Sequence, residues 1–366
     1  MNKYSFNQIS LKQYIFIIFE AQVGIGVLSL PRDLAKTAGK DGWISILLGW
    51  ILSMLLSLII IRIMEKNPEY TLIELLSKYF GKWVGKSLSV LWVLYATLAA
   101  SVVMFSTIHI IKVWIILDIR DFILMILFVI PIYMITKHGI RVIGIFAELV
   151  FLVSLWMPFL LFYTFKDTHW LFLLPIGKEG LLPILSTAKS TILSFLGFEL
   201  AFILYPFLKD KKSATKGIVI ANSLSMFVFL MVTVISFVRF SQDQIKDYAY
   251  PTLNLLKLIR LPFLERLEIT FLSFYLFMLF MTIIPYLYTA VLGASQLCGK
   301  QDHRNVLRVL VSLWILVSFF FHPSSSQIIQ MGKSWGMAGT YFAFVFPIFL
   351  WIYGWLFHLT RKEQKQ

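Results

Sequence analysis

Two short glycine-containing stretches interrupt long apolar segments and could bind a small polar ligand. One contains Gly24-Ile25-Gly26-Val27, and the other contains Phe195-Leu196-Gly197-Phe198. Glycine weakens a helix by about 1 kcal/mol relative to alanine. An unwound turn frees backbone N–H groups at the start of one half-helix and carbonyls at the end of the other. Because the N–H end favours a carboxylate and the carbonyl end an ammonium group or a cation, we expect a site for a small zwitterion or amine.

Three carboxyl side chains lie inside the apolar segments. Glu20 precedes Gly24 by about one turn, Glu199 follows Gly197 closely, and Glu148 lies in a different segment. Ionisable groups within a membrane are costly and usually functional. Two roles stay open for them: a proton or cation pathway beside the pocket, or a structural role as protonated or hydrogen-bonded groups that tie broken helices together.

Polar side chains on other apolar segments could complete the pocket, although aromatic residues there are more often packing residues. The full set of candidate ligand-binding residues is Gly24, Ile25, Gly26, Val27, Phe195, Gly197, Phe198, Tyr95, Ser101, Tyr288 and Thr289. Within this set we expect Gly26 to lie where the first span unwinds, with its backbone close to the ligand. Valine there would add two methyl groups to the pocket and disfavour any positive φ that the break requires, so it should impair binding. Gly49, in an uninterrupted segment, should tolerate valine better.

Composition places the chain in the membrane class. The sequence is 59% hydrophobic and 14% charged, whereas soluble proteins carry about 25% charged residues. The mean hydropathy is +0.81. The single Cys298 excludes an internal disulfide bond. Nucleotide-binding, metalloprotease and serine-hydrolase motifs are absent from the sequence, which predicts no catalytic residues, no metal site, no cofactor and no enzymatic activity.

The elements that must position these residues are transmembrane helices, because several apolar runs exceed the roughly 20 residues that span a bilayer. Hydropathy predicts a single all-α transmembrane domain over residues 1–366 with ten spans. The predicted spans are about 12–38, 43–64, 87–113, 120–136, 142–165, 183–208, 215–240, 265–298, 305–322 and 335–359. Breaks in the first and sixth spans predict two repeats of five, about 12–165 and 183–359, in inverted orientation. A short interfacial helix is expected around residues 250–257.

Basic residues in the loops predict the orientation. Lysine and arginine are in excess on the side that carries both termini, so we expect both termini in the cytoplasm. The net charge of +14 then reflects this bias and contact with anionic lipid headgroups of the bilayer. We expect no nucleic acid partner.

The chain resembles a known family at several of these positions. Val23 to Leu28 and Phe195 to Glu199 resemble the first-span and sixth-span signatures of amino acid–polyamine–organocation transporters. The stretch Gly24 to Arg32 is closer to the spore-germination branch of that superfamily, the B subunits of GerA-type germinant receptors. Asp41-Gly42-Trp43, Tyr205-Pro206-Phe207 and Tyr250-Pro251-Thr252 add to this resemblance.

The resemblance implies a five-plus-five inverted-repeat fold with broken helices 1 and 6. It also implies a receptor subunit that senses a nutrient germinant, in complex with A and C subunits, in the inner membrane of the spore. Since the two helix breaks favour a small zwitterion, an amino acid is the expected germinant. A proton- or cation-coupled amino acid permease remains the alternative, because fold and pocket are common to both functions.

Overall fold

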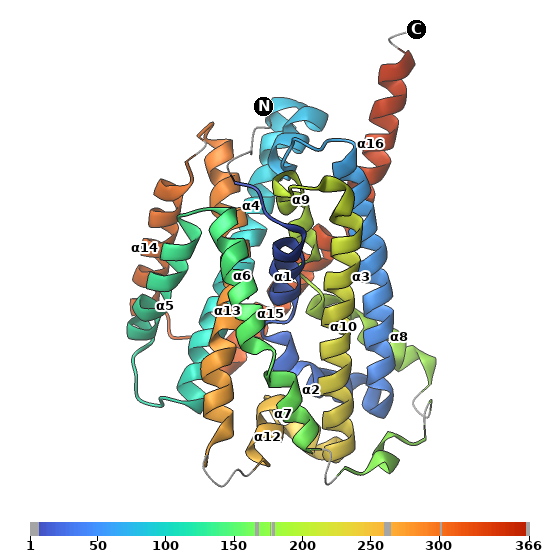
Figure 1. The fold of residues 1–366 in the computed structure, drawn as a ribbon, viewed down its shortest axis with the longest axis vertical. Helices are drawn as coiled ribbons and strands as arrows, with labels where there is room; N and C mark the ends of the chain where they lie inside the picture. The colour runs from blue at the N-terminus through green and yellow to red at the C-terminus, as the bar shows by residue number, and fades with distance from the viewer. Residues whose placement is uncertain are drawn as a thin grey trace.

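A computed structural model describes residues 7–164, 168–175, 177, 180–259, 265–300 and 302–363. Within these ranges the chain forms helices, and its one isolated β-bridge joins Ile9 and Leu208 (Figure 1). The bridge places the start of the first predicted span beside the end of the sixth. The two spans therefore run in opposite directions, as an inverted repeat requires.

The first half of the chain forms seven α-helices in the described residues. They are α1 (Leu11–Gln22), α2 (Gly26–Ala38), α3 (Gly42–Glu65), α4 (Leu72–Trp114), α5 (Asp121–Thr136), α6 (Ile140–Ser154) and α7 (Met157–Phe162). Gly81, with φ of 76°, kinks α4. The kink separates the amphipathic start of this helix from the part that was predicted as the third span.

The second half contains shorter pieces at its start and long helices after them. Its α-helices are α8 (Leu181–Ser194), α9 (Ala201–Leu204), α10 (Ala214–Arg239), α11 (Gln242–Asp247), α12 (Pro251–Lys257), α13 (Leu267–Leu297), α14 (Arg304–Phe320), α15 (Ser325–Gly339) and α16 (Phe346–Glu363). A π-helical turn, Thr340–Val345, joins α15 to α16. This last span begins at Ser325, earlier than the predicted residue 335, because a Ser324 capping box starts the helix there.

The predicted helix breaks are confirmed. The chain leaves helical structure between α1 and α2, and again between α8 and the 3₁₀ turn η4 (Phe198–Leu200). Continuing through α9 and the turn η5 (Tyr205–Phe207), the second half-helix is bent by 46° relative to α8. Both breaks lie where the glycines lie.

Among the described residues, six helical segments are long and apolar enough to cross a membrane, or seven when the bent pair counts as one span. The total of ten predicted spans therefore stays a prediction. One predicted span is a shorter apolar helix: α5 has 16 residues, which gives a length of about 24 Å. Such a helix needs its neighbours and flanking residues to complete a crossing.

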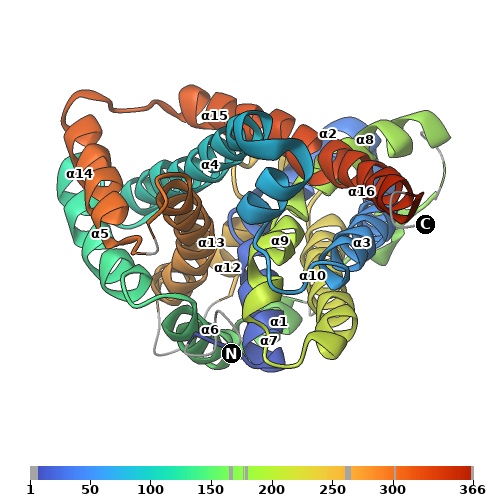
Figure 2. The same cartoon turned by 90° about the horizontal axis from the view of Figure 1, so that it is seen from above.

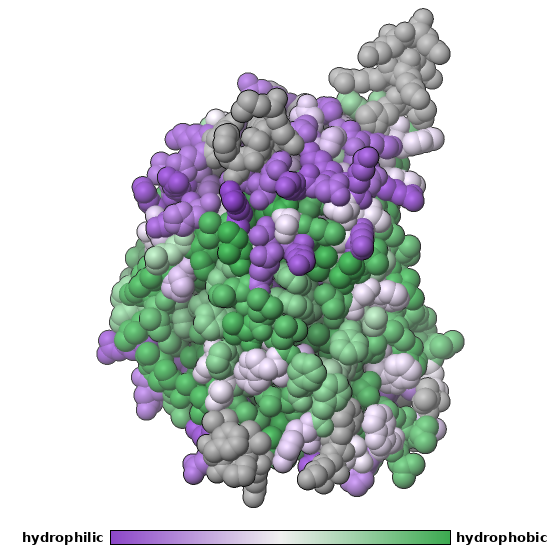
Figure 3. Space-filling model, viewed as in Figure 1, coloured by the Kyte–Doolittle hydropathy of each residue, from purple (hydrophilic) through white to green (hydrophobic). Residues whose placement is uncertain are grey.

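The outer surface fits a membrane environment. Hydrophilic residues gather at one end of the molecule, with a wide apolar belt beneath them (Figure 3). Large apolar side chains are exposed at the surface, including Leu127 at 58%, Leu316 at 57% and Phe320 at 84%. Seen from above, α9 lies near the centre of the bundle, whereas α5 and α14 lie side by side at one edge (Figure 2).

A short helix was expected around residues 250–257, and α12 occupies this stretch as a packed part of the bundle. Leu253, Leu255 and Leu256 are fully buried, and α12 packs against α2, α10 and α13. The Thr252 hydroxyl donates to the Val27 carbonyl at 2.7 Å. This carbonyl needs an outside donor because the residue four positions later in α2 is Pro31, which has no N–H.

Candidate ligand-binding site

The second helix break is closed by a carboxyl group of its own. Glu199 is fully buried, and its Oε2 accepts the backbone N–H of Gly197 at 2.7 Å. Its Oε1 accepts the hydroxyls of Tyr95 at 2.7 Å and Tyr286 at 2.6 Å. The N–H end of this break is therefore occupied by the protein, and Glu199 links it to α4 and α13.

Gly197 holds the sharpest backbone turn at the site. Its φ of 129° is a conformation that side-chain-bearing residues rarely adopt. A Cβ atom there would lie 2.9 Å from the Gln22 Cγ and 3.1 Å from the Gln22 backbone nitrogen. Both the backbone angle and the close approach to α1 require glycine at this position.

The first break is held from outside, by hydroxyls of α13. The Tyr275 hydroxyl lies 2.6 Å from the Val23 carbonyl and 2.6 Å from the Gly24 carbonyl, so its hydrogen is shared between them. The Thr282 hydroxyl donates to the Glu20 carbonyl at 3.1 Å. A Cβ at Gly24 would lie 2.4 Å from the Thr282 Oγ1. The carbonyl end of the first break is thus covered by protein donors.

A buried amide joins the two breaks. The Gln22 side-chain nitrogen donates to the Phe195 carbonyl at 2.9 Å and to the Asn222 Oδ1 at 2.7 Å. Its oxygen accepts the Ser225 hydroxyl at 2.6 Å, and Asn222 in turn donates to Ser57 at 2.9 Å. The network fixes the end of α1 to α8, α10 and α3.

The start of α2 differs from these filled positions. Its N-cap residue, Ile25, supplies no side-chain hydrogen bond to the first turn. A Cβ at Gly26 would lie 3.6 Å from the Ser194 Cβ and 3.8 Å from Phe229, which are ordinary contacts. The first N–H groups of a helix have no partner within it, so this end can bind an anion.

The two glycine expectations are corrected by this geometry. Gly26 is the first residue of α2 and has no left-handed backbone; the positive φ at the site belongs to Gly197. Gly49 is the tighter position, since a Cβ there would lie 2.7 Å from the Thr191 Oγ1. It allows α3 to approach α8 closely, and Gly49→Val is therefore no neutral control.

Two predicted aromatic residues flank the second break. Phe195 packs edge-on against Phe229, with ring centroids 5.2 Å apart, and Phe198 packs edge-on against Phe344 at 5.8 Å. Both side chains are fully buried.

Of the three remaining candidates from other spans, two have contacts away from the breaks. Ser101 accepts the Trp314 indole N–H at 2.8 Å, and Tyr288 packs edge-on against His303 at 5.3 Å. Thr289 is buried on α13 beside Tyr288.

The remaining two carboxyl groups are in unlike surroundings. Glu20 is fully buried, and neither of its oxygens has a hydrogen-bond partner within the described part of the chain. Glu148 is half-buried on α6, a helix that packs against α1 and α13. A charged carboxylate at the position of Glu20 would be costly.

The sequence-based set missed the residues that close the breaks from neighbouring helices. They are Gln22, Asn222, Tyr275, Thr282 and Thr252. The usable signal was a side-chain amide inside an apolar span, as in Gln22 and Asn222, because such a group needs a buried partner. The hydroxyl residues carry little signal, since Ser and Thr in a helix also bond to their own backbone.

Comparison with solved structures identifies the same fold in transport proteins. A sodium-coupled sialic acid symporter in a substrate-bound outward-open state is 14% identical, with a TM-score of 0.64, over 94% of this chain and 81% of that one. MhsT in complex with L-phenylalanine is 11% identical, with a TM-score of 0.60, over 95% and 99% of the two chains. The chain therefore has the all-α fold of these membrane transporters.

Sequence comparison gives the family. Spore germination protein GerQB of Bacillus cereus is 27% identical over 346 residues, covering 94% of this chain and 95% of that protein. Spore germination protein B2 of Bacillus subtilis (strain 168) is 22% identical and covers 98% and 99% of the two chains. The family model described as spore germination protein matches residues 8–327. This integral membrane chain, with its two broken helices, belongs to the spore germination protein family.

Proposed function

We propose that the protein is the membrane subunit of a spore germinant receptor and binds an amino acid between its two helix breaks. The observation that carries the proposal is a difference between the two helix breaks. Neither Ile25 nor Gly197 caps the helix that follows it with a side chain, but at the second break the Glu199 carboxyl group already lies 2.7 Å from the Gly197 N–H. A ligand carboxylate therefore has one N–H end available to it.

The ligand would take its orientation from this difference. Its carboxylate would lie at the N–H groups of Gly26 and Val27, where the helix dipole is favourable. Its ammonium group would face the carbonyl end of α8, near Phe195. Phe229, which lies next to both Gly26 and Phe195, would then contact the ligand side chain. Ser101 and Tyr288 are outside this proposal because they contact Trp314 and His303 instead.

Binding would act as a trigger by shifting an equilibrium between two arrangements of the broken helices. A ligand changes such an equilibrium only through different affinities for the two states. Gln22 contacts α8 and α10 at once, so a ligand that moves either break would move both. We propose that A and C receptor subunits contact this chain in the inner membrane of the spore and respond to its change of conformation. In this proposal both chain termini lie in the cytoplasm.

The alternative function, a cation-coupled permease, is less well supported by the first break. Freed carbonyls at a broken helix are where a transporter binds its coupling cation. Here the Val23 and Gly24 carbonyls accept the Tyr275 hydroxyl. A sodium ion would have to displace this bond, and we therefore favour a receptor that works without sodium coupling at this break.

The test of the proposed site is Gly26→Val. Its two methyl groups would enter the space between α2, Ser194 and Phe229. We expect spores with this variant to need a higher germinant concentration, by about tenfold or more, at near-normal protein level, since one unfavourable contact of about 1.4 kcal/mol is a factor of ten. The response of spores to a panel of amino acids and the protein level in spore membranes are measured together.

The matched control is Gly332→Val on α15, because a Cβ there meets no atom within 4 Å in the described chain. Its germinant response should stay close to that of the parent. Equal dose–response curves for both variants would remove α2 from the binding site. Accumulation of a labelled amino acid in proteoliposomes, driven by a sodium or proton gradient, would favour the permease.

A further inference from the structure

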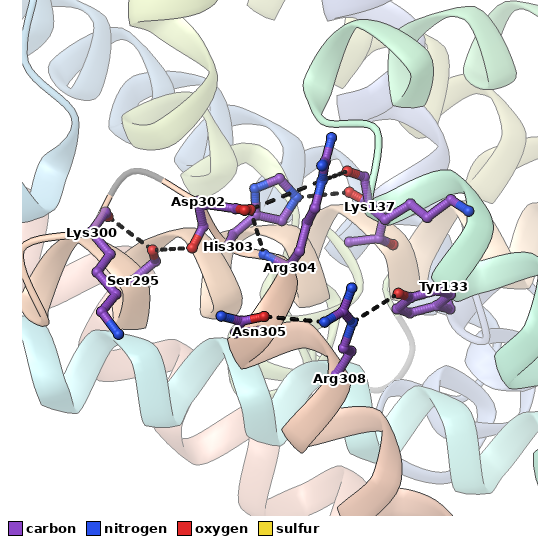
Figure 4. A network of polar contacts seen from close by, with 10 residues as sticks. Tyr133, Lys137, Ser295, Lys300, Asp302, His303, Arg304, Asn305 and Arg308 are labelled. Carbon is purple, nitrogen blue, oxygen red and sulfur yellow. Dashed lines mark hydrogen bonds and ion pairs between the residues drawn. The ribbon is translucent and has the colours of Figure 1, made fainter.

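A cluster of basic side chains lies where α5 ends and α14 begins (Figure 4). The Arg308 Nε lies 3.4 Å from the Tyr133 hydroxyl, and its Nη1 lies 3.3 Å from the Asn305 Oδ1. The Arg304 Nε donates to the Lys137 carbonyl at 3.5 Å. The Lys137 Nζ lies 5.6 Å from the centre of the same Tyr133 ring whose hydroxyl contacts Arg308, so Tyr133 and the Lys137 backbone connect the three basic residues.

The charges in this cluster do not balance. Asp302 is the carboxylate that contacts it, with 4.0 Å between its Oδ1 and the Arg304 Nε. The same oxygen also accepts the Arg304 backbone N–H at 2.9 Å. Exposed ion pairs contribute little free energy, and Arg304 and Asp302 have exposed side-chain fractions of 57% and 64%. Three cations against one carboxylate leave positive charge available for an anion.

Lys300, Asp302 and His303, which precede α14, are held by hydrogen bonds. The Ser295 hydroxyl contacts the carbonyls of Lys300 and Asp302, at 2.9 and 2.8 Å. The His303 Nε2 lies 3.0 Å from the Thr136 carbonyl at the end of α5. The cationic groups are therefore presented from a frame that already exists, which lowers the entropy cost of binding.

An apolar surface continues from the cluster along both helices. Exposed apolar residues of α5 include Leu127, Ile130 and Met134, and those of α14 include Val309, Leu313 and Leu316. Phe122 and Phe319 stack at the far end of this helix pair, with centroids 4.4 Å apart. The eleven residue steps from Arg308 to Phe319 rise by about 16 Å, roughly half of the hydrocarbon thickness of a bilayer.

An anionic phospholipid matches both parts of this surface. A guanidinium group binds phosphate through two parallel hydrogen bonds, and acyl chains fit an exposed apolar strip one leaflet deep. Free phosphate would use the cations but leave the strip without a role. We propose that Arg304, Arg308 and Lys137 bind the phosphate of an anionic phospholipid whose acyl chains lie along α5 and α14.

The test measures binding of the full-length, detergent-purified protein to lipid vesicles of two compositions. Binding of phosphatidylglycerol and of phosphatidylcholine is compared for the parent and for Arg304→Gln/Arg308→Gln. The control is Lys209→Gln/Lys212→Gln, which removes the same charge from exposed residues of another loop. We expect phosphatidylglycerol binding to weaken about tenfold or more in the arginine variant and less than about twofold in the control.

Other arms separate the possible explanations. Arg308→Lys keeps the positive charge but loses the two parallel hydrogen bonds of the guanidinium group, so it should weaken lipid binding partly. This variant also tests the site if the double variant fails to fold. Equal weakening in both double variants would overturn the proposal, because charge alone would then explain binding. Competition by millimolar inorganic phosphate as effective as that by the lipid would show a free-phosphate site and would also overturn it.

Discussion

The two helix breaks are stabilised in different ways. At the second break, Glu199 accepts the freed Gly197 N–H and two tyrosine hydroxyls within one buried carboxyl group. At the first break, the freed carbonyls of Val23 and Gly24 depend on Tyr275, which lies 251 residues beyond Gly24 in the sequence. The acceptor at the second break is two residues away in the sequence, whereas the donor at the first break comes from the distant helix α13.

The proposed ligand position follows from this difference. The second break is filled by covalently attached groups, so its geometry is present before any ligand arrives. The first break has its carbonyl end covered, but the start of α2 has no side-chain cap. A ligand anion would complete the first break as Glu199 completes the second. Substitutions at each break should therefore have distinct effects on folding and on response.

The largest effect is expected for Gly197→Ala. Alanine at φ of 129° is strained by about 1–3 kcal/mol, and its Cβ would press against Gln22. We expect a strong loss of folded protein, measured as the monodisperse fraction and the melting temperature in detergent. Gly26→Ala is the matched control, because its Cβ meets only ordinary contacts. Equal melting temperatures for the two variants would contradict this view of the breaks.

A smaller but still severe effect is expected for Glu199→Gln. An amide at this position cannot accept from the two tyrosines and Gly197 at once, and a buried group left unpaired costs about 1–3 kcal/mol. The melting temperature should fall and the germinant response should be lost or weakened. Glu148→Gln, half-buried on α6, should change either property little. A normal dose–response for Glu199→Gln at normal abundance would exclude Glu199 from the site.

Part of this arrangement could be predicted from the sequence, for a local reason. Gly24 and Gly197 lie in apolar segments that lipid would otherwise require to be continuous helices, so the breaks follow from residue type alone. The identity of Glu199 as a group that helps to hold a break also follows, since it lies two residues from Gly197. These are short-range effects of neighbouring residues in the chain.

The rest depends on packing between distant segments. Nothing near Gly49 in the sequence indicates that α8 lies against it, and the contact with Thr191 decides that it must be glycine. The burial of α12 likewise depends on α2 and α13 covering it. Residue type alone does not distinguish Gly24 from Gly26, whereas the structure begins helix α2 at Gly26.

Tyr275→Phe tests whether a hydroxyl group covers the carbonyls of the first break. The variant loses the hydroxyl that covers two carbonyls, and the net loss of a hydrogen bond is about 0.5–1.5 kcal/mol. We expect a modest fall in melting temperature in potassium buffer, partly restored by sodium, because the freed carbonyls can then bind a cation. The parent should show no difference between the two cations. A sodium-dependent melting temperature in the parent would contradict the covered-carbonyl view.

The smallest effect is expected for Thr252→Val, and it tests the origin of one bond at the first break. The Val27 carbonyl has no donor in α2 because of Pro31, and the Thr252 hydroxyl supplies it. Removing the hydroxyl should lower stability by about 1 kcal/mol. Pro31→Ala restores an N–H in the helix, so the loss from Thr252→Val should be smaller in that background than in the parent. Melting curves of the four proteins in this double-mutant cycle give the coupling, and additive losses would mean that Thr252 acts on α2 through packing alone.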